Sequence, residues 1–407
     1  MDNNTCTDIN NRRTLYDILW SSLATIFACI WVSVHPNIPP QLEEIPLPQN
    51  IALFSASGCR YQFRRAWNRV VEIRPRLKLM ITALIAPEIM VGFAARQWFS
   101  ARTFSRRYEV SLTHGFFYSM GGFVNAEGYI MDEYQISAVR VLAAIKAVPQ
   151  AEIEDKSKSD VLAKLLAVTQ ILRIVAQSLA RWDQHLAITS LELTTVAYAV
   201  VTTFMWFFWM NKPLDTHTVI QILPKPSENQ CSCQWEGDLQ TSTNHTIHRL
   251  TGSQRFQGML TGQYDGRHKF RNVPAYFSTP FPSFNDAHIA YVIECGVAIV
   301  FGAIHCIAWN STFPSMAEKW MWRSSAVVVT GVPVGYLVWT ECWNNHIAPP
   351  DSCPDWLHAI AMCLQTVVVY LYIIARLFLL VLPFTALRSL EPAVFIDVSW
   401  AKYIPHL

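Results

Sequence analysis

Long apolar runs separated by shorter polar stretches dominate the chain. A helix needs about 20 mostly apolar residues to cross the hydrocarbon core of a bilayer. Windows of this kind cover residues 15–34, 77–98, 161–182, 188–210, 287–309, 322–339 and 357–384. The pattern predicts an all-α fold, a polytopic transmembrane helix bundle with seven spans.

Window 161–182 also permits a different interpretation. It carries Lys164 and Arg173, and a helix with charges on one face can lie at the membrane interface instead of crossing. Six spans are therefore the alternative. A polar turn, Asp183-Gln184-His185, follows this window directly, so the segment 161–210 is expected to form a helical hairpin.

The windows also divide the chain into regions. In order, we expect an outside N-terminus with the first helix (1–36), an Arg-rich cytoplasmic loop (37–76), the second helix (77–98), a loop region (99–160), the hairpin (161–210), a long polar loop (211–286), three helices (287–384) and a C-terminal tail (385–407).

Arginines set the expected orientation. Six of them lie in the loop 37–76, and short Arg-rich loops stay in the cytoplasm. With seven spans, the N-terminus and the segments 211–286 and 340–356 then face the lumen or the exterior. The arginines at 102, 106 and 107 follow the second window on its outer side and count against this orientation.

Two features agree with a lumenal or exterior side. Asn244-His245-Thr246 is a glycosylation sequon, and Asn3-Asn4-Thr5 is a second one. Cys342 and Cys353 share one short loop, where an oxidising compartment permits a disulfide.

The composition of the chain limits the classes of molecule that it is expected to bind. Hydrophobic residues make up 52% of the chain and charged residues 15%, with a net charge of +2. A soluble chain carries roughly 25% charged residues, and nucleic-acid binders are usually strongly basic. The expected partners are membrane lipids and an apolar small-molecule substrate, not nucleic acid.

Motifs for cofactors and metals are weak. One residue separates Cys231 from Cys233, whereas zinc modules prefer two to four residues, although His245 and His248 follow in the same loop. The chain has no GxGxxG, GxxxxGK[ST], HExxH or GxSxG motif. We therefore expect no cofactor and no metal site.

Ionisable residues inside the apolar windows are the stronger signal, because charges in lipid are costly and often mark function. They are Glu88, Arg173, Glu192, Glu294, His305 and Arg376. The catalytic candidates are Glu88 as a general acid with Arg96, His114 and Glu192 in support; the substrate-binding candidates are Glu294, His305 and Trp98. The structural alternative is that these charges lock helices together, that Glu192 suits a helix start and that Arg376 snorkels to the interface.

Several short stretches along the chain form a recognisable combination: His35-Pro36-Asn37, Ala86-Pro87-Glu88, Arg96-Gln97-Trp98, Thr113-His114-Gly115-Phe116, Gly121-Gly122-Phe123, Glu192 and Lys212-Pro213-Leu214-Asp215. Together they resemble a family of uncharacterised multi-pass membrane proteins of filamentous fungi. The resemblance implies an endoplasmic reticulum, other endomembrane or plasma membrane location. Because some such relatives are encoded in secondary-metabolite gene clusters, it also implies a role in natural-product biosynthesis.

Three functions fit these observations. The first is a membrane-embedded enzyme or accessory protein of secondary-metabolite biosynthesis acting on an apolar intermediate. The second is a proton-coupled transporter or exporter of a small molecule, in which the same acids carry protons. The third is a membrane receptor or scaffold, which rests on the seven-span topology alone.

Overall fold

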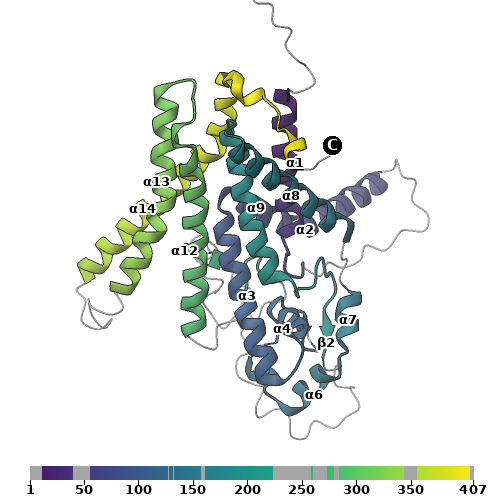
Figure 1. The fold of residues 1–407 in the computed structure, drawn as a ribbon. Helices are drawn as coiled ribbons and strands as arrows, with labels where there is room; N and C mark the ends of the chain where they lie inside the picture. Colours follow the sequence, from purple (N-terminus) through teal and green to yellow (C-terminus); the bar gives the residue numbers. More distant parts are fainter. Residues whose placement is uncertain are drawn as a thin grey trace, which may run out of the picture.

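The computed structural model of the chain is almost entirely helical, in agreement with the predicted fold class (Figure 1). It describes residues 12–39, 56–126, 128–131, 133–156, 161–222, 258–259, 273–278, 284–342 and 355–403. The predicted glycosylation sites Asn3 and Asn244, the cysteines Cys231 and Cys233, and the expected disulfide partner Cys353 lie outside these residues.

Eight long helices form the main bundle. They are α1 (Leu15–Ser33), α2 (Ala56–Ile85), α3 (Pro87–Tyr108), α8 (Val161–Asp183), α9 (Ser190–Trp209), α12 (Phe284–Ile307), α13 (Met316–Cys342) and α14 (Asp355–Ala386). The shorter elements are α4 (Leu112–Ser119), α5 (Glu133–Ile136), α6 (Val139–Ala147), α7 (Gln150–Asp155), and the strands β1 (Phe123–Val124) and β2 (Ile220–Gln221). Short 3-10 helices at Ala308–Asn310, Leu387–Ser389, Pro392–Phe395 and Trp400–Lys402 complete the described part.

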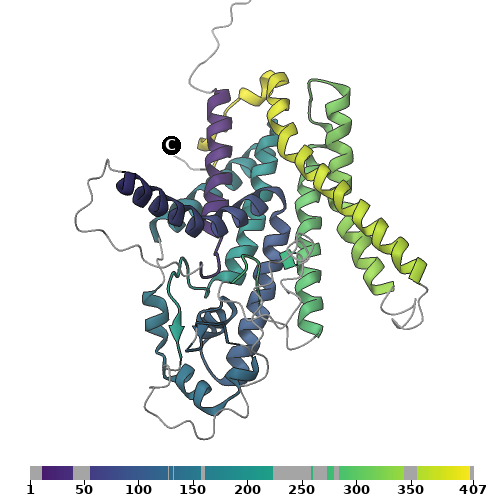
Figure 2. The same cartoon turned by 180° about the vertical axis from the view of Figure 1, so that it is seen from behind.

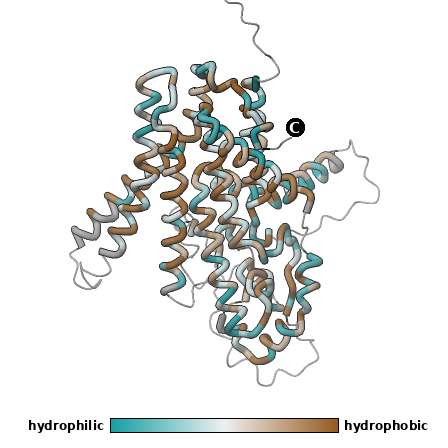
Figure 3. The backbone as a smooth tube through the Cα atoms, viewed as in Figure 1, coloured by the Kyte–Doolittle hydropathy of each residue, from teal (hydrophilic) through white to brown (hydrophobic). Residues whose placement is uncertain are grey.

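Five of the described helices are long and apolar enough to cross a membrane. Their apolar segments are Leu15–Ser33, Leu162–Asp183, Ser190–Trp209, Asp286–Asn310 and Cys363–Ser389. Apolar residues run along α12 and α14 in particular (Figure 3). The protein is therefore suited to a membrane, but the predicted count of seven spans is not supported.

The predicted span 77–98 is not one helix. Helix α2 ends at Ile85 and α3 begins at Pro87, while Ala86 between them has φ −142° and ψ 72°. A proline disfavours helical geometry in the residue before it and is well suited to the first position of a helix. Pro87 therefore divides the apolar window into two helices.

These two helices form a hairpin that enters the bundle and returns. On the α2 side, Arg76 donates to Asp215, and on the α3 side, Gln97 accepts from Lys212; both partners follow the end of α9. At the break, the carbonyl of Leu84 accepts from the Tyr198 hydroxyl, in the interior of α9. The break between α2 and α3 thus lies partway along α9, and both arms lead to the end where α9 finishes.

Both described ends of the chain lie at the other end of the bundle, which we call the upper end (Figures 1 and 2). The amide of Arg13, just before α1, donates to the carbonyl of Phe395 over 3.0 Å. Lys402 forms an ion pair of 2.7 Å with Asp183, where α8 finishes. An odd number of crossings would put these two ends on opposite sides of a membrane, so the arrangement does not fit seven spans.

Part of the region 99–160, expected as loops, forms a second small core at the lower end. We call it the α4–α7 cluster. Strand β1 pairs in parallel with β2, Phe123 opposite Ile220, and the core contains buried apolar residues such as Phe117, Met120 and Ile145. A search for long apolar windows does not detect helices as short as α4 to α7.

Candidate functional site

The break between α2 and α3 leaves helix-end carbonyls that need donors, because the last carbonyls of a helix have no partner within it. Two other helices supply them. The Tyr198 hydroxyl of α9 donates to the carbonyl of Leu84, and Arg376 Nε of α14 donates to the carbonyl of Ile85 over 3.0 Å. In a lipid environment such groups must be satisfied by protein. Side chains of two other helices therefore stabilise the break.

Glu88 lies in the first turn of α3, directly after the break, and is almost fully buried. Arg376 Nη2 donates to its Oε2 over 2.5 Å, and the Tyr372 hydroxyl donates to its Oε1 over 2.7 Å. The Arg376 guanidinium also lies over the ring of Phe301, 3.8 Å from the ring centre. Both carboxylate oxygens of Glu88 therefore accept hydrogen bonds from side chains of α14.

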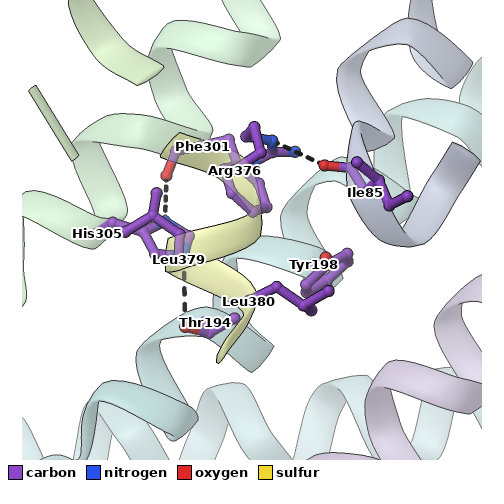
Figure 4. A pocket seen from close by; sticks show the side chains of 8 residues that line it. All are labelled: Ile85, Thr194, Tyr198, Phe301, His305, Arg376, Leu379 and Leu380. Carbon is purple, nitrogen blue, oxygen red and sulfur yellow. Dashed lines mark hydrogen bonds between the residues drawn. The ribbon is translucent and has the colours of Figure 1, made fainter. Parts of the chain in front are cut away.

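A narrow cavity, too tight to admit a water molecule, adjoins this pair (Figure 4). Helices α9, α12 and α14 and the end of α2 line it with Ile85, Thr194, Tyr198, Phe301, His305, Arg376, Leu379 and Leu380. His305 Nδ1 lies 2.7 Å from the carbonyl of Phe301, which can only accept, so this nitrogen carries the proton in the neutral ring. Its Nε2 lies 3.3 Å from the Thr194 hydroxyl. The lining is mainly apolar, with a guanidinium and an imidazole at one side.

A second buried ion pair joins α3 to α12. Arg96 Nη1 donates to Glu294 Oε2 over 2.8 Å, and both side chains are largely buried. Gly92, one turn earlier on α3, faces the same carboxylate so closely that any side chain there would collide with Glu294. The glycine therefore permits the close approach of α3 and α12 that this pair needs.

A buried lysine forms a third polar group, which we call the Lys212 cluster. Lys212 Nζ donates to the carbonyl of His35 over 2.5 Å, to Gln97 Oε1 over 2.8 Å and to Asn37 Oδ1 over 3.3 Å. It also lies 4.7 Å from the centre of the Trp209 ring. Burial lowers the pKa of Lys212 well below its ordinary value. Its three acceptors are uncharged carbonyl and amide oxygens, so none of them is a carboxylate that would oppose this shift.

Sequence reasoning did not select Lys212, Gln97 or Asn37 as site residues. The signal was nevertheless present, because all three lie in stretches on which the family resemblance rests. What the sequence could not provide was their meeting in space. The segments after α1, within α3 and after α9 supply one side chain each to the same cluster.

Glu192 has a capping and clamping role at the upper end. With Thr189 it forms a capping box at the start of α9, in keeping with the structural alternative for this residue. It also forms an ion pair with Arg13, whose Nε donates to the carbonyl of Val394 over 2.7 Å. Arg181 binds the carbonyl of Ile396 over 2.7 Å, so the C-terminal segment is held by two buried arginines.

The four catalytic candidates are not brought together. Glu88, Arg96 and Glu192 each belong to a different ion pair. His114 lies in the α4–α7 cluster, where its ring bonds to Ser111 Oγ over 2.7 Å and to the carbonyl of Val148 over 2.9 Å. The four residues therefore do not form one site in which Glu88 could act as a general acid with the other three in support.

The remaining candidates divide in the same way. His305 reaches the pocket beside Arg376, which is buried there instead of snorkelling. Trp98 packs against Phe208 with its ring under Arg102, and Arg173 is exposed on α8. Within the described residues, no group of three or more His, Cys, Asp or Glu side chains is placed to hold a metal ion.

The fold and the buried ion pairs define a polytopic α-helical bundle suited to a membrane. The chain belongs to DUF8562, a family of unknown function, whose model matches residues 103–233 and 288–407. The match includes Lys212, Glu294, His305 and Arg376. No curated protein and no solved structure in the comparisons matches the chain.

Proposed function

We propose that this protein is a proton-linked transporter of a small molecule, and that the cargo binds beside Arg376 when the helices around the narrow cavity of Figure 4 move apart. The observation that carries the proposal is the broken hairpin whose tip lies against Glu88, Arg376 and the pocket. Discontinuous helices that meet near the middle of a bundle, with half-helix ends directed at the substrate, are a recurrent construction of transporters.

The geometry suggests how a proton and a cargo could be linked. Arg376 lines the pocket and is bound to Glu88 over 2.5 Å. An apolar cargo with an anionic or strongly accepting group would compete with Glu88 for the guanidinium. Glu88 would lose its counter-charge in that exchange and would take up a proton, because an unpaired carboxylate is costly inside the bundle. Cargo loading and proton uptake thus occur together.

The same arrangement supports a six-crossing topology. Helices α1, α8, α9, α12 and α14, which carry the long apolar segments, cross together with α13, which an even number of crossings requires. The α2–α3 hairpin enters and leaves on one side. The arginines of α2 and those at 102, 106 and 107 then share that side, which the positive-inside tendency makes cytoplasmic. The termini face the exterior or lumen, whereas the segments around Asn244 and Cys353 become cytoplasmic, opposite to the seven-span expectation.

The family resemblance adds a cargo class. A secondary metabolite, made in an organism that stores or secretes it, combines an apolar skeleton with acidic or carbonyl groups suited to Arg376. The location that fits this role is an endomembrane or the plasma membrane.

The proposal is tested by comparing the small molecules inside cells and in the medium for a deletion strain and its parent. Transport predicts that the normal end product is retained in the cells of the deletion strain. Glu88→Gln should fail to restore its release, although Glu318→Gln, which alters the more exposed Glu318–Arg388 pair of 2.7 Å, should restore it. Normal release in the deletion strain would overturn the proposal.

A second candidate, an embedded enzyme of the same biosynthesis, is favoured by one observation. The Nε2 of neutral His305 is an acceptor at a pocket that also contains Arg376, and such a pair could move a proton on an apolar intermediate. An enzyme predicts that the end product disappears from the deletion strain and that a new intermediate accumulates, which separates it from a transporter.

A further inference from the structure

The first part of α2 extends away from the bundle as an arm of residues 56–75 (Figures 1 and 2). One stripe of this helix is apolar and exposed: Phe63, Trp67, Val70, Ile73, Leu77 and Ile81 are between 49% and 69% accessible. Their spacing of three or four residues places them along one face of a helix. The stripe thus has no cover from the described part of the chain.

The rest of the helix is strongly basic. It contains Arg60, Arg64, Arg65, Arg69, Arg74, Arg76 and Lys78 against a single acidic residue, Glu72. Arg64, Arg65, Arg69 and Arg76 lie off the stripe, whereas Arg60 and Arg74 lie along its face by the same spacing. The first five arginines are exposed. An amphipathic helix with a basic polar face and large apolar residues on the other face is the pattern of a helix that lies in a membrane interface.

Contacts at the base of the arm show where it leaves the bundle relative to the end of α1. Arg76 donates to the carbonyl of Trp31 over 3.1 Å and lies over the Trp31 ring at 4.2 Å. Trp31 is in the last turn of α1, an apolar helix that ends at Ser33. The arm therefore leaves the bundle at the level where a crossing helix ends, and it extends sideways from there (Figure 1).

We propose that the α2 arm is a binding site for anionic phospholipid headgroups of the protein's own bilayer. The apolar stripe enters the outer part of the acyl chains, while the arginines flanking it bind lipid phosphates and carboxylates. Charge complementarity selects this occupant over a zwitterionic lipid, because clusters of basic residues close to a cytoplasmic leaflet attract anionic lipids. The proposal is independent of any transport activity.

The test uses the full chain reconstituted in vesicles of phosphatidylcholine with phosphatidylglycerol. Spin-labelled phosphatidylglycerol and phosphatidylcholine report which lipid is enriched at the protein. The wild type should enrich the anionic lipid. The variant with Arg60, Arg64, Arg65 and Arg69 all changed to Gln should lose that enrichment and bind both lipids equally.

A charge-matched control changes Arg106, Arg107, Arg140 and Lys146 of the lower end to Gln, and it should keep the enrichment. Equal loss in both variants, or no enrichment by the wild type, would overturn the proposal.

A second measurement places a nitroxide at Val70→Cys on the stripe and at Glu72→Cys on the opposite face. Oxygen should reach the first label and a water-soluble nickel complex the second. A Val70 label shielded from both would indicate a protein partner and also overturn it.

Discussion

Gln97 connects four buried polar groups. Its Nε2 donates to Asn37 Oδ1 over 2.8 Å and to the carbonyl of Phe277 over 3.0 Å. Its Oε1 accepts from Lys212 Nζ over 2.8 Å and from Trp209 Nε1 over 3.1 Å. One amide therefore fixes the relative positions of the segments that follow α1 and α9 on the surface of α3.

Gln97→Leu tests this role at nearly constant volume. The Trp209 N–H loses its partner and Lys212 loses one of its three acceptors. A buried polar group left without a partner costs about 1–3 kcal/mol, so the variant should lose stability by about this amount. Chemical unfolding of the purified protein in micelles measures the loss. Gln150→Leu, on the exposed start of α7, should change stability by less than about 0.5 kcal/mol. A similar small effect at position 97 would contradict the account of the Lys212 cluster.

His35 should make stability fall with acid. Burial lowers its pKa from 6.5 to about 3, and its Nδ1 lies 2.9 Å from the carbonyl of Ser33. Between these pH values the unfolded chain binds a proton that the folded chain does not. The contribution of neutral His35 to the free energy of unfolding is therefore complete above pH 6.5. As the pH falls below this value, the free energy of unfolding decreases by up to about 1.4 kcal/mol per pH unit.

The variant His35→Asn keeps a donor near Nδ1 but does not titrate. Unfolding measured from pH 7 to pH 5 should show a shallower decrease for this variant than for the wild type. Parallel curves would show that His35 is not buried in its neutral form.

Helices α12 and α13 depend on a glycine at their contact. A Cβ on Gly302 would meet the Thr330 backbone nitrogen at 2.7 Å, which is closer than real contacts allow. Gly302→Ala should therefore destabilise the protein by about 1–3 kcal/mol, as overpacked sites do.

Gly296 is the matched control on the same helix, because nothing lies within 4 Å of its added Cβ. Gly296→Ala should leave stability unchanged or raise it by about 0.5–1 kcal/mol, since alanine favours a helix. Thermal unfolding of the two variants side by side makes the comparison. Equal effects would mean that α12 and α13 do not pack as described.

At the level of elements, the sequence could reveal those whose signal is local. Helices α1, α9, α12 and α14 coincide with long apolar windows, since a bilayer demands that pattern. The break at Pro87 was missed because hydropathy averaged over a window ignores a single proline. The rule that a proline disturbs the residue before it was available and could have found it.

Ion pairs between distant segments could not be found in this way. Glu88 and Arg376 were both recognised as costly charges, but 288 positions separate them and no local pattern joins them. The sequence therefore predicted which residues matter inside the bundle better than it predicted which of them meet. This difference explains why a single catalytic cluster was expected where several separate pairs occur.

In the whole molecule, both described ends lie at one end of the bundle, and the proposed topology returns the α2–α3 hairpin to the side of the membrane that it entered. In sealed vesicles, an impermeant maleimide should therefore label Gln62→Cys and Arg106→Cys from the same side. Thr312→Cys, in the turn between α12 and α13, should react from the opposite side. Seven spans predict that positions 62 and 106 lie on different sides, so this labelling decides between the two topologies.

The most direct test of proton-linked transport is uptake of the retained end product into proteoliposomes that contain the full chain, with and without a pH gradient. The proposal predicts that the wild type concentrates the compound only when the gradient is present. In the Glu88→Gln variant, the compound should at most reach equal concentrations on the two sides of the membrane, because the carboxylate that exchanges with the cargo at Arg376 is gone. Uptake by the wild type that is indifferent to the gradient, or conversion of the compound to another product, would contradict the account.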